Sequence, residues 1–285
     1  MGDARLTIDA HEAEPYSWTM ARWAPHAGLA EHATGYTGYV ERSALPLRRR
    51  EVANGNVTVI ISFGDVLDVR RADDEAPQRH TSFVAGLHDH FVVTEHGGRQ
   101  FGVQLDLTPL GAYRILGLPP SELAHQVVAA DELDGTVLTE LAARMADAPD
   151  WTARFDVLDR ELLRRAVDGP EPDPAITWAW HQLAGAHGAV PVGVLAEEIG
   201  WSRRHFATRF RHHVGLAPKV AARILRFQHA VDRLQQPGAP DISAVAASCG
   251  YADHSHLVRE FQHLAGCAPT ALLCAQLPDG GGFAG

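Results

Sequence analysis

The strongest constraint on the fold is a pattern of apolar residues, glycine and proline that occurs twice in the last third of the chain. In each copy an apolar stripe with helical spacing ends at a glycine suited to a left-handed helix cap, and an aromatic residue follows. A second apolar stripe, another glycine and a proline complete the copy. The matched positions are Gly200 and Gly250, Trp201 and Tyr251, Phe206 and Leu257, Phe210 and Phe261, Gly215 and Gly266, and Pro218 and Pro269. Two helix-turn-helix units are therefore predicted, about fifty residues apart.

One helix is predicted to join the two units, over residues 219–236. Its apolar residues alternate at spacings of four and three, which gives a continuous buried stripe. The stripe consists of Val220, Ile224, Phe227, Val231 and Leu234. A helix buried in this way would hold the two units at a fixed separation. Lys219, Arg223 and Arg226 lie off the stripe, where their long side chains can reach a polyanion or water.

Charge is distributed unevenly along the chain. The formal net charge of −10 is carried by residues 1–170, because residues 171–285 have equal numbers of basic and acidic side chains. Residues 201–234 alone contain eight Lys or Arg and one Asp. A local basic stripe of this kind can bind a polyanion although the whole chain is acidic. The global charge therefore does not exclude nucleic acid as a partner.

The second helix of the first unit has the side chains expected of a DNA reader. Ser202 is suited to cap this helix, and Phe206 and Phe210 mark its buried face. Arginine can bind O6 and N7 of guanine in the major groove, threonine can contact a thymine methyl, and alanine allows close approach. A solvated helix face is the alternative, but the place of these charges within a helix-turn-helix unit favours DNA. The outward face carries Arg203, Arg204, Ala207, Thr208 and Arg211.

The corresponding helix of the second unit is less basic. It begins at Ala252 or Asp253, and Leu257 and Phe261 form its buried face. Because an acidic residue, Glu260, lies among its polar residues, we expect this helix to read less sequence than the first. The residues that can face outward are His254, Ser255, Val258 and Arg259.

Residues 190–273 resemble the DNA-binding domain of AraC/XylS-type transcription regulators. The resemblance is carried by LAEEIGWSRRHFATRFRHHVGLAP in the first unit and by GYADHSHLVREF, with the glycine and proline that follow, in the second. It implies a domain of seven helices whose two recognition helices enter successive major grooves on one face of the duplex. It also implies that the DNA bases are read by Arg204, Ala207, Thr208, Ser255 and Arg259.

Further residues are expected to hold the DNA backbone. They lie beside the base-reading positions or on the connecting helix, within the basic stripe or at the start of the second recognition helix. Among the base-reading positions, Ala207 can make no polar contact, so it either contributes nothing to sequence recognition or selects by shape. The expected backbone contacts are Arg203, Arg211, Lys219, Arg223, Arg226 and His254.

The first half of the chain reads as strands followed by helices. The segments VTVIISF (57–63) and FGVQLDL (101–107) have strand composition, and SFVAGLHDHFVVTE between them predicts further short strands and a loop. After residue 110, LGAYRIL, SELAHQVV, TVLTELAARM and WTARFDVLDRELLRRAV predict helices. This α+β arrangement is similar to the sensory halves of some AraC-type regulators, which are a cupin-like β-barrel followed by dimerising helices. The similarity implies a small-molecule effector and a homodimer.

Prolines mark the main domain boundary. Pro170, Pro172 and Pro174 prevent regular structure and favour an extended connector. An α+β half, a cupin-like β-barrel plus helices, is thus expected before an all-α domain with two helix-turn-helix motifs. The predicted regions are a β-rich sensory domain (1–109), a helical dimerisation and coupling region (110–168), a linker (169–174), the DNA-binding domain (175–277) and a flexible tail (278–285).

An incomplete metal motif is the main alternative interpretation of the first half. His88, His90 and Glu95, followed by Gly102, have the spacing of a cupin metal motif, and such ligands suit divalent iron, manganese or nickel. Ser82 stands where that motif has its leading glycine, and no second half with a further histidine is found. A histidine-rich surface loop explains the same residues, so no metal or other cofactor is expected.

Other classes of function are weakly represented in the sequence. The basic run at residues 48–50 could receive an anionic effector, or it could be a solvated strand end. No Ser-His-Asp or Cys-His arrangement can be assembled, so an enzyme is not expected. The first residues are polar and acidic, and no apolar run approaches the length of a membrane span. The sequence therefore predicts a cytoplasmic transcription regulator that binds double-stranded DNA, responds to a small molecule and has no membrane partner.

Overall fold

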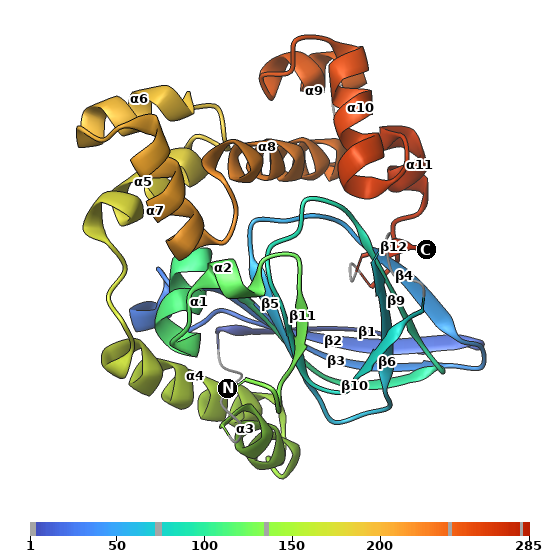
Figure 1. Ribbon diagram of the computed structural model, residues 1–285. Coiled ribbons are helices and arrows are strands. Elements are labelled where there is room, and N and C mark those ends of the chain that lie inside the picture. The colour runs from blue at the N-terminus through green and yellow to red at the C-terminus, as the bar shows by residue number, and fades with distance from the viewer. Residues whose placement is uncertain (1–3, 72–75, 134–136, 239–240, 280–281) are drawn as a thin grey trace.

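The computed structural model describes residues 4–71, 76–133, 137–238, 241–279 and 282–285. In this part of the chain the first half, together with one short strand from the C-terminal end, forms two antiparallel β-sheets that face each other (Figure 1). One sheet has the order β1 (Leu6–His11), β2 (Tyr16–Trp23), β3 (Ala33–Ser43), β10 (Arg99–Leu107), β5 (Val57–Ser62), β8 (Phe83–Ala85) and β11 (Val127–Ala129). The other has the order β12 (Phe283–Ala284), β4 (Leu47–Glu51), β9 (Val92–His96), β6 (Leu67–Arg71) and β7 (Gln78–His80).

Strand alternation gives the first sheet two different faces. In β5 the side chains of Val57, Val59 and Ile61 are fully buried in the main hydrophobic core, whereas Thr58 and Ile60 line a cavity between the sheets. This follows from the two-residue period of a strand, which sends successive side chains to opposite faces. The sheet therefore has one face for the helices and one face for a ligand.

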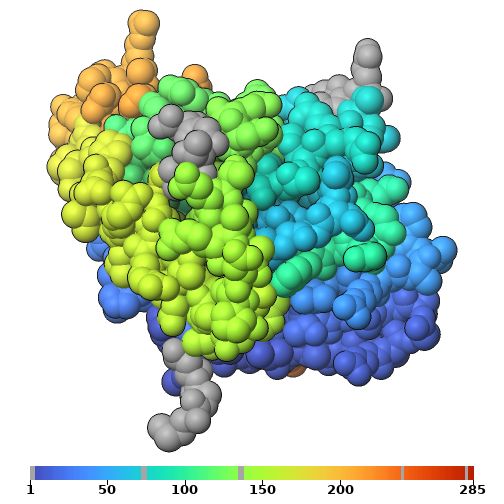
Figure 2. Space-filling model, turned by 90° about the horizontal axis from the view of Figure 1, so that it is seen from below, coloured from blue at the N-terminus to red at the C-terminus, as the bar shows by residue number. Residues whose placement is uncertain are grey.

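Helices pack against the outer face of this sheet and share its hydrophobic core. Seen from below, the helical residues 137–168 lie beside those of the N-terminal strands (Figure 2). The helices are η1 (Ala27–Leu29), α1 (Pro109–Leu116), α2 (Pro120–Leu123), α3 (Val137–Ala146) and α4 (Trp151–Asp168). The buried carboxylate of Asp159 holds α4 in place, because it accepts hydrogen bonds from the Tyr36 hydroxyl at 2.9 Å and the Arg5 guanidinium at 2.8 Å. A charged acceptor of this kind makes a strong hydrogen bond.

The helix predicted for SELAHQVV is wrong in its second part. The helix α2 ends at Leu123, and the chain then turns at His125, which has a positive φ of 60°. Val127–Ala129 form β11, which pairs with β8. The two β-branched valines suit a strand, and the open edge of β8 supplies its hydrogen-bond partners. Tertiary pairing thus overrides the local helical pattern.

The last third is entirely helical up to residue 274, in the described residues, and consists of seven helices. They are α5 (Pro174–Gly185), α6 (Val192–Ile199), α7 (Arg203–Val214), α8 (Pro218–Gln235), α9 (Ile242–Ser248), α10 (His254–Ala265) and α11 (Pro269–Cys274). The connecting helix α8 runs between a first unit, α6 and α7, and a second unit, α9 and α10 (Figure 1). The predicted fold class, a β-rich half with helices joined to an all-α domain with two helix-turn-helix units, is confirmed.

The two units have the same turn. Gly200 and Gly250 both adopt the left-handed conformation, with φ of 77° and 75°. In each unit the amide of the next aromatic residue donates to the carbonyl five residues back, Trp201 to Ala196 at 2.9 Å and Tyr251 to Ala246 at 3.0 Å. The repeat seen in the sequence is therefore a repeat of backbone geometry.

None of the helices in the described part of the chain combines the length and the apolar character that a transmembrane span requires.

Candidate DNA-binding surface and ligand cavity

The predicted base-reading helix of the first unit is α7. Ser202 caps it, since its side chain accepts a hydrogen bond from the His205 amide at 3.2 Å. Phe206 and Phe210 are fully buried. The opposite face is open: Arg203, Arg204, Thr208 and Arg211 are exposed, and Ala207 is half-buried. The structure therefore brings all five predicted residues onto one accessible helix face.

The second unit presents a shorter set of polar side chains on α10. Asp253, rather than Ala252, caps this helix by accepting a hydrogen bond from the His256 amide at 2.6 Å. His254, Ser255 and Arg259 are exposed, as their predicted roles require. The surface of α10 is thus accessible, but it offers one arginine where α7 offers three.

The connecting helix α8 gives a mixed result for the predicted backbone contacts. Lys219 is exposed at its start. Arg223, in contrast, donates to both carboxylate oxygens of Glu260 at 3.0 and 3.1 Å, and Arg226 donates to the Gly188 carbonyl at 3.1 Å. These two arginines already bind groups of the domain itself, so the sequence pattern could not separate a surface cation from one that joins helices.

A cavity of about 190 Å³ lies between the two sheets. Its walls are mostly apolar, and they come from both sheets, which is typical of small-molecule sites. The apolar lining residues are Met20, Val52, Ala53, Ile60, Leu67, Val69, Phe83, Ala85, Val92 and Val127. Its polar lining includes a group around Arg49, the pair His88 and His90, and further residues such as Thr37, Thr58 and Gln104.

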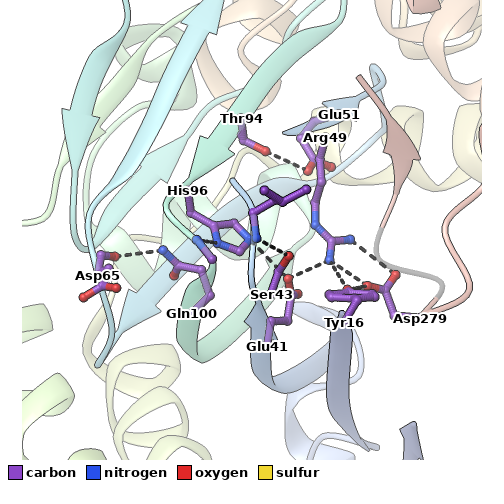
Figure 3. A network of polar contacts seen from close by, with 12 residues as sticks. Tyr16, Glu41, Ser43, Arg49, Glu51, Asp65, Thr94, His96, Gln100 and Asp279 are labelled. Atoms are coloured by element: carbon purple, nitrogen blue, oxygen red, sulfur yellow. Dashed lines mark hydrogen bonds and ion pairs between the residues drawn. The ribbon is translucent and has the colours of Figure 1, made fainter. Parts of the chain in front are cut away.

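The polar lining around Arg49 is a connected network, which Figure 3 shows. Arg49 is buried and binds Glu41 at 2.8 Å and Asp279 at 2.6 Å. His96 lies 3.3 Å from the same Glu41 oxygen, and Tyr16 donates to Asp279. Burial and the hydrogen bond to Asp279 raise the pKa of Tyr16, so its hydroxyl stays protonated. A ligand in the cavity would meet a fixed set of charged partners here.

A third carboxyl group, that of Glu51, lies beside the network. Glu51 lines the cavity and accepts a hydrogen bond from the Thr94 hydroxyl at 3.3 Å. Burial raises the pKa of Glu51, because removal from water penalises the charged carboxylate. The raised pKa favours the protonated form of Glu51, and a protonated carboxyl group can donate as well as accept a hydrogen bond.

The basic run at residues 48–50 is neither a solvated strand end nor a single anion site. Strand alternation separates its members: Arg48 is exposed, and Arg49 points into the cavity network. Arg50 lies on the other face, where it donates to the Ala265 carbonyl of α10 at 2.9 Å and stacks over Phe91. One strand thus contacts both the cavity and the second helix-turn-helix unit.

The prediction of a flexible tail at 278–285 is wrong for the residues that the structure describes. Asp279 is buried against Arg49, and Phe283 and Ala284 form β12, which pairs with β4. The physical reason is the open edge of β4, which offers unpaired backbone groups, together with the buried guanidinium of Arg49. No sequence signal could have joined Asp279 to Arg49, because they lie 230 positions apart.

The alternative metal set from the sequence motif, His88, His90 and Glu95, is not brought together. Glu95 is exposed on the outer face of β9, because its neighbours Thr94 and His96 face the cavity. His125, which the sequence pattern did not indicate, lies beside His88 and His90 instead. The spacing rule fails because it assumes that the glutamate falls on the inward face of the strand.

The first unit also packs against the first half of the chain. His213, at the end of α7, is buried, and its ring lies 4.9 Å from that of Tyr113 in α1. Gly215 approaches Pro120 of α2 so closely that a side chain there would meet its carbonyl. Burial, followed by the charges of His212 and Arg209, lowers the pKa of His213 to about 4. The two halves therefore share an interface.

Comparison with known proteins gives a family match within the last third of the chain. Residues 195–274 match the family described as "Helix-turn-helix domain". No curated protein matches the chain. Among solved structures, ToxT from Vibrio cholerae O395 is similar over 92% of this chain and 98% of its own, with 10% identity and a TM-score of 0.47. The AraC-like transcriptional activator CuxR is similar over 76% of this chain and 85% of its own, with 12% identity and a TM-score of 0.32.

Proposed function

Because the last third of the chain is a helix-turn-helix domain of the AraC type, we propose that this protein is a cytoplasmic transcription regulator that binds specific sequences in duplex DNA. The observation that carries the proposal is the pair of matched units with exposed recognition helices, α7 and α10, held by the buried helix α8. A rigid connection between two reading helices is what contact with two successive major grooves requires.

The two recognition helices have separate tasks in this proposal. Arg204 and Thr208 read base edges for α7, Ala207 allows close approach, and Ser255 and Arg259 read for α10. The DNA backbone is held by Arg203, Arg211, Lys219 and His254. Arg223 and Arg226 contribute by fixing the positions of the helices around α8, through Glu260 and Gly188.

A small-molecule effector in the cavity between the sheets is the second part of the proposal. The cavity combines apolar walls with the Arg49 network, so we expect an apolar compound with one polar or acidic group. Such a group can bind Arg49 only in competition with Asp279, which belongs to the tail of the DNA-binding half. Binding would then loosen the tail and shift the arrangement of the two halves.

A second route links the cavity to the DNA-binding half. The amide of Gly55, in the loop that follows β4, donates to Gln228 of α8 at 3.1 Å. The neighbouring residues Ala53 and Asn54 line the cavity. A change in this loop would therefore reach the helix that connects the two helix-turn-helix units.

Selection of binding sites from a random duplex pool with the full-length protein tests the DNA function. We expect a recovered motif with two short elements about one duplex turn apart, roughly 10 base pairs. Binding should weaken steeply as salt concentration increases, because phosphate contacts release counterions. Recovery of random sequence, or binding with no dependence on salt, would reject the proposal.

A homodimer through the helices of residues 110–168 is also proposed, and sedimentation velocity measures it directly.

A further inference from the structure

Three histidines and an aspartate meet beside the cavity, at the opposite end of β9 from His96. His88, Asp89 and His90 belong to the segment before β9, and His125 belongs to the turn before β11. The ring centroids of the three histidines lie 6.0 to 6.5 Å apart. His88 and His90 line the cavity, so the cluster faces the proposed effector space.

The ligand atoms of three of these residues have the spacing of a metal site. Asp89 Oδ1 lies 3.0 Å from His90 Nδ1 and 3.4 Å from His125 Nδ1. One ligand atom from each of the three residues lies within 4.8 Å of the other two. Ligands held about 2.0–2.2 Å from a tetrahedral or octahedral ion lie roughly 3.0–3.5 Å from each other. The two distances from Asp89 Oδ1 to the histidine nitrogens, 3.0 and 3.4 Å, both fall within this range.

The chain conformation and the surroundings support the same interpretation. His125 has a φ of 60°, a region that non-glycine residues rarely adopt, and this conformation turns its ring toward Asp89. Both ring nitrogens of His88 are buried without a hydrogen-bond partner among the described residues. A water molecule bound to a metal ion would supply such a partner.

We propose that Asp89, His90 and His125 bind one divalent transition metal ion, with a coordination position open toward His88 and the cavity. Two imidazoles and one carboxylate suit Zn²⁺, Co²⁺ or Ni²⁺, and an open fourth position is typical of sites that bind a further ligand. This set replaces the His88, His90 and Glu95 arrangement of the sequence motif. The proposed metal site does not depend on the proposed DNA-binding function, because metal binding can be measured without DNA.

Calorimetric titration of chelator-treated, untagged, full-length protein with Zn²⁺ tests the site. We expect one ion per chain, and an affinity at least about tenfold lower in each of Asp89→Asn, His90→Gln and His125→Asn. Asparagine is chosen at position 125 because it tolerates a positive φ. The matched control is His263→Gln, an exposed histidine of α10 outside the cluster, which should bind Zn²⁺ like the wild type.

Titration with Co²⁺ provides a second readout, since its visible absorption reports the coordination number. We expect bands of a four- or five-coordinate site in the wild type and their loss in His90→Gln. Circular dichroism without metal checks that each variant is folded, and any one folded variant suffices because each lacks one ligand. Absence of binding, or equal affinity in the wild type and these variants, would overturn the proposal.

Discussion

The two helix-turn-helix units have the same backbone but different surfaces. Both have a left-handed glycine after the first helix and a side-chain cap at the start of the second, Ser202 in one and Asp253 in the other. The first recognition helix exposes three arginines in its reading and backbone positions, whereas the second exposes one and has Glu260 bound to Arg223. Glycines and caps therefore define the fold of a unit, and the exposed side chains define what it can bind.

The surroundings of the two units differ as well. The first unit is held by α1 and α2 through His213 and Gly215. The second is held by Arg50 and, through the tail that follows α11, by the Arg49 network at the cavity. A signal from the cavity therefore has a shorter path to the second unit than to the first.

Removal of the tail contact should give the largest effect. Asp279→Ala leaves Arg49 buried and still bound to Glu41, and loss of one member of a buried pair costs about 3–5 kcal/mol. We expect faster hydrogen exchange in β4 and β12, with no change in α7. Exposed Asp253→Asn, which keeps its cap, is the control. An unchanged exchange rate in β12 would show that the tail is held by other contacts.

Base reading should differ between the units. Arg204→Ala is expected to lose about 1–3 kcal/mol of binding free energy at one position of the selected site, while binding to unrelated DNA changes little. Arg259→Ala, in the less basic unit, should lose less. Fluorescence anisotropy with specific and unrelated duplexes measures both. If Arg204→Ala weakens binding to all sequences equally, Arg204 contacts the backbone instead.

A lower pH should reduce the stability of the protein through His213, which packs the first unit against α1. The pKa of His213 is lowered to about 4 in the folded chain and is near 6.5 in the unfolded chain. Above pH 6.5 the ring is neutral in both states, so the neutral buried His213 costs the folded state no stability. As the pH falls toward 4, the unfolded chain binds a proton at this ring and the folded chain does not, so the free energy of unfolding decreases. We expect a decrease on the order of 1–2 kcal/mol at pH 5.

Urea unfolding of the wild type and of His213→Phe at pH 7 and pH 5 measures this contribution. The phenylalanine keeps an aromatic ring against Tyr113 but does not titrate, so the variant should lose less stability at pH 5. His11→Gln, on exposed β1, should behave like the wild type. An identical pH dependence in His213→Phe would contradict the assignment.

The helix caps should give the smallest effects, and equal ones. Ser202→Ala and Asp253→Ala each remove one hydrogen bond to an amide of the first helical turn, at a cost of about 1 kcal/mol. Ser202→Asn retains a cap and serves as the control. Thermal unfolding measures all three, and a cost confined to one unit would show that the caps are not equivalent.

The sequence by itself determined the helical domain. Its landmarks are local: a glycine that adopts a positive φ, a cap at the next helix and a buried stripe at helical spacing all act within a few residues. Such short-range rules can be read from one sequence, and they also placed Arg204, Thr208 and Arg259 on exposed faces.

Only the tertiary structure decided how the sensory half is built and connected. The cavity network joins Arg49 to Asp279, the histidine cluster recruits His125 and excludes Glu95, and Arg223 binds Glu260. The first two depend on which strand edge is open and which face of a strand is inward, and the third depends on how α8 packs against α10. Those choices come from contacts between distant segments, which no local pattern encodes.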